Sequence, residues 1–518
     1  MVIRFAPAAA GTLPEGDHHA RAAAKNVQTV SAASEAMVEC LARRRSGGDA
    51  AYDRILLRAA AGAGKSYALR RLVADAVALD HDVRVGVTAF TNKQILPLAM
   101  GLGAALGSSE VCLFVGKERI GDVPAEAFRM CQVTSDRNAV GPDLRAIVAT
   151  SHKWGASARW QRQAWGLQRD EPLFDVLFVD EAWQLPSHLY RGVEFLAPLV
   201  VGVGDVGQLS PIEIGDNPWR GDPGYNPYRA WPTAYEQGDP RTWVADLPAV
   251  WRPTAAQLPL WRAFYSDWDR LDCVAAPGDR RVDVSEMGPV ATAVWHQVGS
   301  GVPTLLEVDG LPEPEAADID LPLLGVVESL VGELVESGFS LVEQRYDDTG
   351  DPVAEQTIRS VDPSGDPLIV VLATRNQAVD DAADMVGRLT ERLDLPDGVL
   401  VASTVDSWQG QTNRITVAIH PLSGADQLDE FNSAFGRLAV TCTRATHGLL
   451  MVARSGLDDL LANAPARPGT PLGEPGVRQL PRQTHERILA AFARGTLTVT
   501  ENGRSALSAA EDQAPTTK

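Results

Sequence analysis

The sequence predicts an α/β protein with two domains, each built on a parallel sheet covered by helices. Short apolar segments alternate with helix-like patterns, which is typical of strands buried on both faces of a sheet. In the first half these segments are residues 54–57, 83–88, 146–150, 173–179 and 198–203, and in the second half 367–374, 398–403, 414–419 and 448–452. The length of 518 residues also exceeds that of one ordinary domain.

A stretch rich in proline, glycine and tryptophan, residues 215–248, interrupts this pattern and places the domain boundary near residue 250. We expect residues 1–25 to be a flexible N-terminal tail, and residues 101–145 to be a small insert within the first domain, 26–250. The second domain would span 251–460 and include an acidic segment, 301–366. Residues 461–518 would supply one helix, at 483–493, and a disordered polar tail.

Composition excludes several classes of protein. No apolar run has membrane-spanning length, and no basic region followed by an apolar core marks a secretory signal. The five cysteines are scattered without a Cys-x-x-Cys pair, and the nine histidines lack metal spacing. We therefore expect no disulfide framework, zinc site or membrane association, and a reducing cytoplasm as the location.

The formal net charge of −20, taken as a whole, argues against a partner that is itself an anion, such as nucleic acid. Sixteen of the acidic residues, with only two arginines, fall within residues 301–366. The rest of the chain is therefore nearly balanced, and a local basic groove is compatible with it. The acidic segment is interpreted as a solvated face, with a docking surface for a protein partner as the alternative.

Lysine is rare, since it occurs only six times while arginine carries the remaining positive charge. Together with the high alanine content, this indicates a GC-rich, bacterial genome. A lysine that persists in such a composition is more informative than usual, and one of the six lies in the first motif.

The first motif follows an apolar strand and opens a helix, which is the context of a phosphate-binding loop. Small residues allow backbone N–H groups to surround phosphates at a helix N-terminus. Lys65 would reach the β- and γ-phosphates of ATP, and Ser66 would ligate Mg²⁺. The motif reads Ala59-Ala60-Ala61-Gly62-Ala63-Gly64-Lys65-Ser66, with Ala59 in place of the usual first glycine.

A second motif places two carboxylates at the end of the apolar strand 177–179, at the edge where α/β sheets bind ligands. Asp180 would hold Mg²⁺, directly or through water. Glu181 would act as the general base on the attacking water. An acidic strand end can also cap the following helix, but two acids in series are less common in that role.

Three further segments show a family resemblance. Residues 204–211, Gly-Asp-Val-Gly-Gln-Leu-Ser-Pro, resemble the third motif of superfamily one helicases. Residues 404–411, Thr-Val-Asp-Ser-Trp-Gln-Gly-Gln, and 436–445, Gly-Arg-Leu-Ala-Val-Thr-Cys-Thr-Arg-Ala, resemble the fifth and sixth motifs of the up-frameshift-like branch, which usually has Phe where Trp408 stands. The resemblance implies that Gln208 senses the γ-phosphate, that Gly410 lies at the nucleotide, and that Arg444 and Arg252 are arginine fingers.

The resemblance also implies residues that contact adenine or the nucleic-acid strand. Gln28 lies where the family reads adenine, although an exposed helical glutamine is an equally good interpretation. Single-strand binding commonly combines charged grooves with stacked aromatics, for which Trp154 and Trp408 are candidates. The implied strand contacts are Thr88, Asn92, Lys93, Ser151, His152, Trp154, Arg375, Asn376, Thr404, Ser407 and Trp408.

Together these motifs imply two tandem RecA-like P-loop NTPase domains that use ATP and Mg²⁺ to move along single-stranded nucleic acid. The motifs do not distinguish DNA from RNA, and we expect DNA as the partner. The fifth and sixth motifs favour 5′ to 3′ movement. The sequence of residues 88–93, by contrast, is closer to that of the DNA-repair helicases that move in the opposite direction. Two alternatives remain: an ATPase that remodels protein–nucleic-acid complexes without unwinding, and a scaffold with an inactive ATPase.

Overall fold

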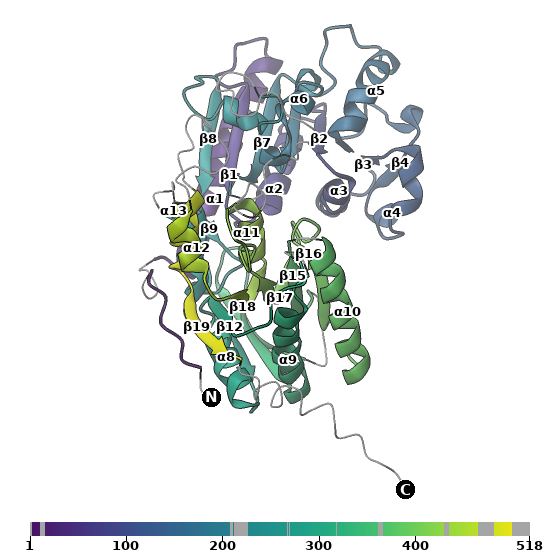
Figure 1. The fold of residues 1–518 in the computed structure, drawn as a ribbon. Helices are drawn as coiled ribbons and strands as arrows, with labels where there is room; N and C mark the ends of the chain where they lie inside the picture. Colours follow the sequence, from purple (N-terminus) through teal and green to yellow (C-terminus); the bar gives the residue numbers. More distant parts are fainter. Residues whose placement is uncertain are drawn as a thin grey trace. The chain divides into compact units, whose positions relative to one another are not determined.

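The computed structural model describes residues 3–10, 16–207, 211, 226–266, 268, 270–316, 319–360, 366–374, 376–428, 432, 435–464 and 481–499. The chain forms two compact units (Figure 1). The first comprises Ala24–Ala249, and the second comprises Met1–Ala23 together with Val250–Lys518. Gln208 and Arg375, two of the predicted site residues, lie outside the described residues.

The first unit is built on an eight-stranded sheet in the order β4-β3-β5-β2-β6-β7-β1-β8, with every neighbouring pair parallel. Strands β2, β3, β5 and β7 are buried along their whole length, which explains their continuous apolar sequences. The strands are β1 (Arg54–Ala59), β2 (Val85–Ala89), β3 (Val111–Phe114), β4 (Gln132–Thr134), β5 (Ala146–Thr150), β6 (Val176–Asp180), β7 (Leu199–Asp205) and β8 (Thr242–Leu247).

Helices connect these strands and cover the sheet. The α-helices are α1 (His19–Arg45), α2 (Lys65–Leu79), α3 (Asn92–Leu106), α4 (Ala127–Met130), α5 (Ser151–Ala164) and α6 (Ser187–Tyr190). Short 3₁₀ helices are η1 (Lys117–Asp122), η2 (Arg137–Ala139), η3 (Ala182–Gln184), η4 (Glu194–Leu196) and η5 (Trp231–Ala234). The first five residues of α1 belong to the second unit, so this helix is shared by both.

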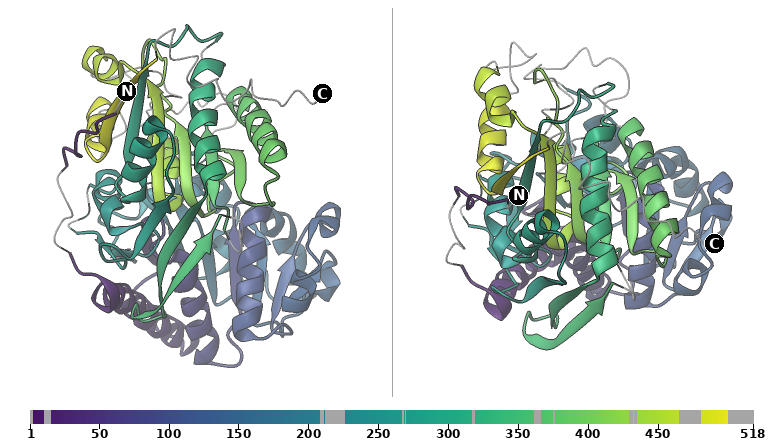
Figure 2. Two further views of the ribbon diagram at one scale, coloured as in Figure 1. Left: turned by 90° about the horizontal axis from the view of Figure 1, so that it is seen from below. Right: turned by 60° about the horizontal axis from the view of Figure 1, so that its bottom comes forward.

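The second unit contains a six-stranded sheet in the order β16-β15-β17-β18-β12-β19, again parallel throughout. A separate three-stranded antiparallel sheet has the order β11-β13-β14, in which β13 and β14 form a hairpin (Figure 2). The strands are β9 (Ala249–Val250, at the unit boundary), β10 (Asp272–Cys273), β11 (Arg280–Val284), β12 (Thr304–Asp309), β13 (Phe339–Tyr346), β14 (Pro352–Arg359), β15 (Ile369–Ala373), β16 (Leu400–Thr404), β17 (Asn413–Ile419), β18 (Ala445–Arg454) and β19 (Ala493–Thr498).

The helices of the second unit enclose a core centred on α8 and α9. Trp295 is fully buried there, and its indole N–H donates to the carbonyl oxygen of Leu330 at 2.8 Å. The helices are η6 (Ala255–Gln257), α7 (Leu258–Phe264), α8 (Pro289–Gly299), α9 (Leu321–Ser337), α10 (Asn376–Leu393), α11 (Phe435–Cys442), α12 (Leu457–Asn463) and α13 (Pro481–Leu489). The two parallel-sheet units confirm the predicted fold class of tandem RecA-like α/β domains.

Three expectations about the domain plan are wrong. Residues 101–145 are not a separate insert, because β3 and β4 within them are strands of the main sheet. Residues 1–25 are not a flexible tail where the structure describes them, since Ala6 bridges to Arg494 and α1 begins at His19. The predicted C-terminal helix ends at Leu489, and the chain then adds β19 to the edge of the second sheet, where alternate residues are buried.

The acidic segment 301–366 contributes β12, α9, β13 and β14 rather than forming a single solvated face. Several of its carboxylates pair with arginines elsewhere in the second unit. Asp320 binds Arg454 at 2.6 Å, Glu307 binds Arg494 at 2.7 Å and Glu328 binds Arg388 at 2.6 Å, while Glu343 pairs with Arg414. Part of the negative charge is therefore neutralised within the unit. Within the described ranges, no helix has both the length and the apolar character to cross a bilayer.

Candidate functional site

The phosphate-loop motif connects β1 to α2 as the sequence predicts. Strand β1 ends at Ala59 and α2 begins at Lys65. Gly62 and Gly64 have φ values of +73° and +92°, in the left-handed region that side chains with a Cβ rarely adopt. The loop turns sharply at these glycines, so the first N–H groups of α2 remain available to an anion at the helix N-terminus. Lys65 and Ser66 occupy this first turn.

Three adjacent strands bring their carboxyl ends to this loop. Strand β7 lies between β6 and β1, with Asp205 in register with Ala59 and Val203 in register with Asp180. The Lys65 ammonium lies 2.9 Å from Oε1 of Glu181 and 3.7 Å from Oδ2 of Asp205. The predicted Lys65 and Glu181 are thus in direct contact, while Asp205 is a third member that sequence reasoning assigned no role.

Charges at this edge shift each other's pKa values. Burial by itself lowers the pKa of Lys65, but the negative charges of Glu181 and Asp205 outweigh it and the net pKa is raised. Lys65 is therefore held as a cation. Burial, followed by the neighbouring charge of Glu181, raises the pKa of Asp180 to about 7. A divalent cation beside Asp180 would favour its carboxylate form, so cation binding would release a proton near neutral pH.

Glu181 is held in an unusual backbone conformation. Its φ of +48° and ψ of +47° lie in the left-handed region, which is strained for a residue with a side chain. The backbone N–H of Glu181 donates a hydrogen bond to Oδ1 of Asp180 at 3.0 Å. The close approach of Gly204 on β7 requires glycine, because a Cβ there would lie 2.7 Å from the backbone nitrogen of Ala182. The turn after β6 is thus fixed against β7, and it directs Glu181 to Lys65.

The few oxygen donors at this edge suit Mg²⁺, rather than a metal that needs three or more protein ligands. Asp180, predicted as a metal ligand, ends β6, and the Ser66 hydroxyl lies in the first turn of α2. In the part of the chain that the structure describes, no group of three or more His, Cys, Asp or Glu side chains could hold a metal. Mg²⁺ usually takes one or two protein oxygens and completes its shell with phosphate and water. Asp180 and Ser66 remain the predicted pair.

A buried asparagine supports the loop from behind. Asn26 on α1 donates through Nδ2 to the carbonyl oxygens of Ala63 at 3.0 Å and Ala249 at 2.8 Å, and its Oδ1 accepts from the N–H of Ala249 at 2.9 Å. All of its amide groups are thus used to tie α1, the loop and β9 together. Gln28, predicted to read adenine, lies exposed two residues further along α1, and its role stays a prediction. Sequence reasoning missed Asn26 because its partners lie 37 and 223 residues away.

The predicted strand contacts of the first unit divide into exposed and buried residues. Asn92 and Lys93 at the start of α3, and His152 at the start of α5, are exposed beyond the carboxyl ends of the neighbouring strands β2 and β5. The His152 ring lies 5.9 Å from that of Phe90. Lys153 lies 4.0 Å above the ring of Phe114. Phe114 is fully buried, so this edge exposes Asn92, Lys93 and His152 rather than a stacking surface built on Phe114. Positively charged groups that follow the strand's backbone are one of the features by which proteins bind single strands.

Three of the predicted strand contacts are wrong for the structure as it stands. Thr88 is fully buried within β2, Ser151 is 3% exposed, and Trp154 is fully buried. Trp154 packs edge-on against Phe174 with ring centroids 5.0 Å apart. The reason is helical spacing: α5 turns Ser151, Trp154 and Ala158 toward the sheet and leaves His152 outside.

We expect Trp154→Ala to destabilise the first unit by about 3–5 kcal/mol, the usual cost of removing a buried aromatic ring. Loss of a stacking platform would instead weaken strand binding without affecting stability. Urea unfolding followed by fluorescence measures the former, with the partly exposed Trp160→Ala on the same helix as the comparison. An unfolding midpoint unchanged in Trp154→Ala would contradict the core assignment.

In the second unit, the residues predicted from the fifth motif form the turn after β16. The hydroxyl of Thr404 accepts from the N–H of Ser407 at 3.0 Å, so it caps the turn. Ser407 is exposed, whereas Trp408 is half-buried and donates its indole N–H to Oδ1 of Asn413 at 3.0 Å. Gly410 has a φ of +82°. The turn is therefore held in one shape, with Ser407 on its outside. Asn376 begins α10, and its side chain lies outside the described residues.

The two predicted finger arginines meet at one corner of the second unit. Arg444 is buried, and it donates to the carbonyl oxygens of Val440 at 3.1 Å and Gln411 at 3.4 Å and to the hydroxyl of Thr443 at 3.1 Å. Arg252 donates to the carbonyl oxygen of Thr443 at 3.0 Å and to the hydroxyl of Thr412 at 3.0 Å. We call residues 411–412 and 443–444 the arginine corner.

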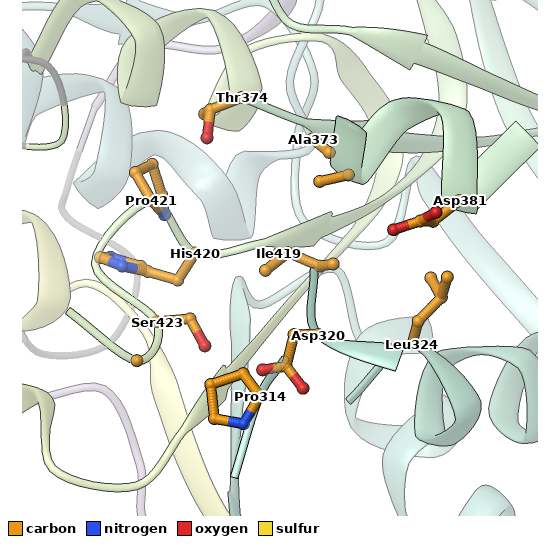
Figure 3. A pocket seen from close by; sticks show the side chains of 12 residues that line it. Pro314, Asp320, Leu324, Ala373, Thr374, Asp381, Ile419, His420, Pro421 and Ser423 are labelled. Carbon is orange, nitrogen blue, oxygen red and sulfur yellow. The ribbon is translucent and has the colours of Figure 1, made fainter. Parts of the chain in front are cut away.

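A small pocket lies at the carboxyl edge of β15 and β17. Its volume is about 50 Å³, with Thr374 at one end and Asp320 at the other (Figure 3). His420 lines it and is 2% exposed, and burial lowers the pKa of this histidine to about 3. The side chain is therefore neutral. The volume suits one or two water molecules rather than a nucleobase.

Comparison with known proteins gives matches in structure only. No protein-family model and no curated protein matches the sequence. The chain is similar to the PRRSV helicase, with a TM-score of 0.36, 13% sequence identity, and coverage of 88% of this chain and 66% of that chain. It is similar to the arterivirus nonstructural protein 10 helicase in complex with DNA, with a TM-score of 0.37, 15% identity, and coverage of 79% and 62%.

It is also similar to the DUF1998 helicase MrfA bound to DNA and AMPPNP, with a TM-score of 0.40, 10% identity, and coverage of 88% of this chain and 53% of that chain. The matched region thus spans about two-thirds or less of each of these proteins. Each of these three proteins is named as a helicase.

Proposed function

We propose that the protein is a nucleic-acid-dependent ATPase of the superfamily one helicase type, which hydrolyses ATP to move along a single strand. The observation that carries this proposal is the contiguous edge formed by β1, β7 and β6. It brings Lys65, at the end of the phosphate loop, within ion-pair distance of both Glu181 and Asp205. A cation, a base and a helix N-terminus at one strand edge are what phosphoryl transfer requires.

Each group has a distinct task in this proposal. The N-terminus of α2 and the Lys65 ammonium bind the β- and γ-phosphates, and Lys65 exchanges its contact with Glu181 for the phosphate oxygens. Glu181, released from Lys65, accepts a proton from the attacking water. Mg²⁺ held by Ser66 and Asp180 would neutralise charge on the phosphates. Gln208 would sense the γ-phosphate, and Arg444 and Arg252 would stabilise the transition state.

Exposed residues at the carboxyl ends of β2 and β5 support a nucleic-acid site in the first unit. Asn92, Lys93 and His152 lie there, beside Lys153. In the second unit, Ser407 on the outside of its turn is the equivalent candidate. We propose 5′ to 3′ as the direction, on the strength of the fifth and sixth motifs, and single-stranded DNA as the track to be tested against RNA.

One observation favours the alternative of remodelling without unwinding. Residues 101–145, the predicted insert, are part of the main sheet, so the described first unit holds no separate subdomain there that could split a duplex. A motor without such a part can translocate and displace bound proteins. Displacement of streptavidin from a biotinylated single strand, set against unwinding of a tailed duplex, separates the two activities. Placing biotin at the 5′ or the 3′ end reports the direction.

The test of the main proposal is ATP turnover with and without single-stranded DNA or RNA, with Lys65→Ala as the blank. We expect strong stimulation by one polymer and none in the blank. Turnover that neither polymer stimulates would contradict the motor, and absence of turnover would favour the scaffold.

A further inference from the structure

The small antiparallel sheet β11-β13-β14 contacts the chain segment that carries Arg252. From β11, Nη1 of Arg280 donates to three consecutive carbonyl oxygens: Trp251 at 2.9 Å, Arg252 itself, and Pro253 at 3.0 Å. One guanidinium nitrogen can serve three carbonyls in a row only if the backbone curves around it. Residues 251–253 are therefore bent around the Arg280 cation.

This bend determines where the Arg252 side chain goes. The backbone carbonyl of Arg252 faces Arg280, and its guanidinium reaches Thr412 and the carbonyl of Thr443 in the arginine corner. Hydrogen bonds from a charged donor contribute roughly twice as much as neutral ones. Without Arg280, three carbonyl oxygens lose a charged donor, and the backbone of residues 251–253 can relax away from its present course.

The residue opposite Arg280 in the small sheet also supports the arginine corner, near residues 411–412. We call this cross-strand pair the β11–β13 rung. Arg280 lies opposite Glu343 in the ladder between β11 and β13. Glu343 pairs with Arg414, which follows Gln411 and Thr412 by two to three residues at the start of β17. It also lies 3.9 Å from Nε2 of the buried His447 on β18. The cross-strand pair of Arg280 and Glu343 thus contacts two segments: Arg280 bonds to residues 251–253, and Glu343 pairs with Arg414 on β17.

We propose that Arg280 is a positioning residue for Arg252, and that the β11–β13 rung holds the arginine corner in the geometry needed for hydrolysis. This inference rests on the proposed ATPase function. The motifs themselves assign no role to β11 or to the β13–β14 hairpin that pairs with it. The β13–β14 hairpin would then act on ATP turnover through Arg280 rather than through any contact with nucleotide.

The experiment compares Arg280→Ala with Arg252→Ala and with the double variant, measuring kcat and KM for ATP in the presence of the stimulating strand. We expect Arg280→Ala to lower kcat by about tenfold to a hundredfold, the range for a displaced catalytic group, with KM unchanged. If Arg280 acts through Arg252, the double variant should be no slower than Arg252→Ala alone. Arg281→Ala, on the exposed neighbour paired with Asp283, is the matched control.

Arg280→Lys keeps the charge, but its shorter side chain does not bring the ammonium to the position of Nη1, so it should show the same kcat loss with less effect on the melting temperature. It replaces Arg280→Ala if that variant does not fold. Wild-type kcat in folded Arg280→Lys and Arg280→Ala, or losses that multiply in the double variant, would overturn the inference while the ATPase itself stands. A wild-type protein without ATP turnover would overturn the proposed function and the inference with it.

Discussion

Replacing Glu181 by glutamine should stop ATP hydrolysis and leave ATP binding intact. The amide keeps the size of the carboxylate but cannot accept a proton from water, and loss of a general base commonly costs about 10²–10⁴-fold in rate. Glu181 also forms the ion pair with Lys65 in the structure. The neutral glutamine releases the Lys65 ammonium toward phosphate, so the affinity for ATP should rise rather than fall.

Single-turnover hydrolysis and equilibrium binding of a fluorescent ATP analogue measure these two effects separately. Glu126→Gln, at an exposed position of the same unit, controls for the loss of one negative charge. If Glu181 serves only to hold Lys65 in place, hydrolysis in Glu181→Gln should fall no further than ATP binding does. Hydrolysis at the wild-type rate would assign the base to another carboxylate, with Asp205 the nearest to Lys65 after Glu181.

The parts of this site that the sequence predicts are those set by neighbouring residues. A strand followed by Gly62, Gly64 and Lys65 determines a phosphate loop locally, since glycine conformation and helix start depend on adjacent residues. Continuous apolar runs likewise predict the parallel strands. The strand order that brings Asp205 beside Lys65, by contrast, depends on β7 lying between β6 and β1. Such pairing is a long-range property that local patterns do not contain.

Motif resemblance also identifies a residue's position in the chain, but it does not say whether the side chain points into the core or to solvent. Trp154 follows a motif linked to strand binding, yet its position on α5 turns it into the core beside Phe174. The pattern of residues 483–493 predicts a helix to the end of that range and no strand after it, but β19 needs only alternate buried residues to join an edge. In both cases the deciding factor was the packing partner, which the sequence does not identify.

Arg444→Ala should lower ATP turnover by around 10³-fold or more while sparing ATP binding, the effect of removing an arginine finger. The buried guanidinium now donates to carbonyls of Val440 and Gln411. A finger role requires it to exchange some of these bonds for the γ-phosphate, so the arginine corner would differ between the free and the ATP-bound protein. Removing the side chain also takes a charged donor from both carbonyls, of which that of Val440 still accepts from the N–H of Thr443 at 3.3 Å, and an unsatisfied buried acceptor costs about 1–3 kcal/mol.

Stability and turnover must therefore be measured on the same preparations, well below the melting temperature of the variant. Arg454→Ala removes another arginine of the second unit, one bonded to Asp320 away from the corner, and serves as the control for loss of a structural ion pair. A purely structural Arg444 would lower the melting temperature of Arg444→Ala, as Arg454→Ala does for its own pair, and leave kcat near the wild-type value. Because the finger acts only on the transferring phosphoryl group, a thousandfold loss of kcat in a folded variant that still binds ATP is an outcome that a structural ion pair cannot produce.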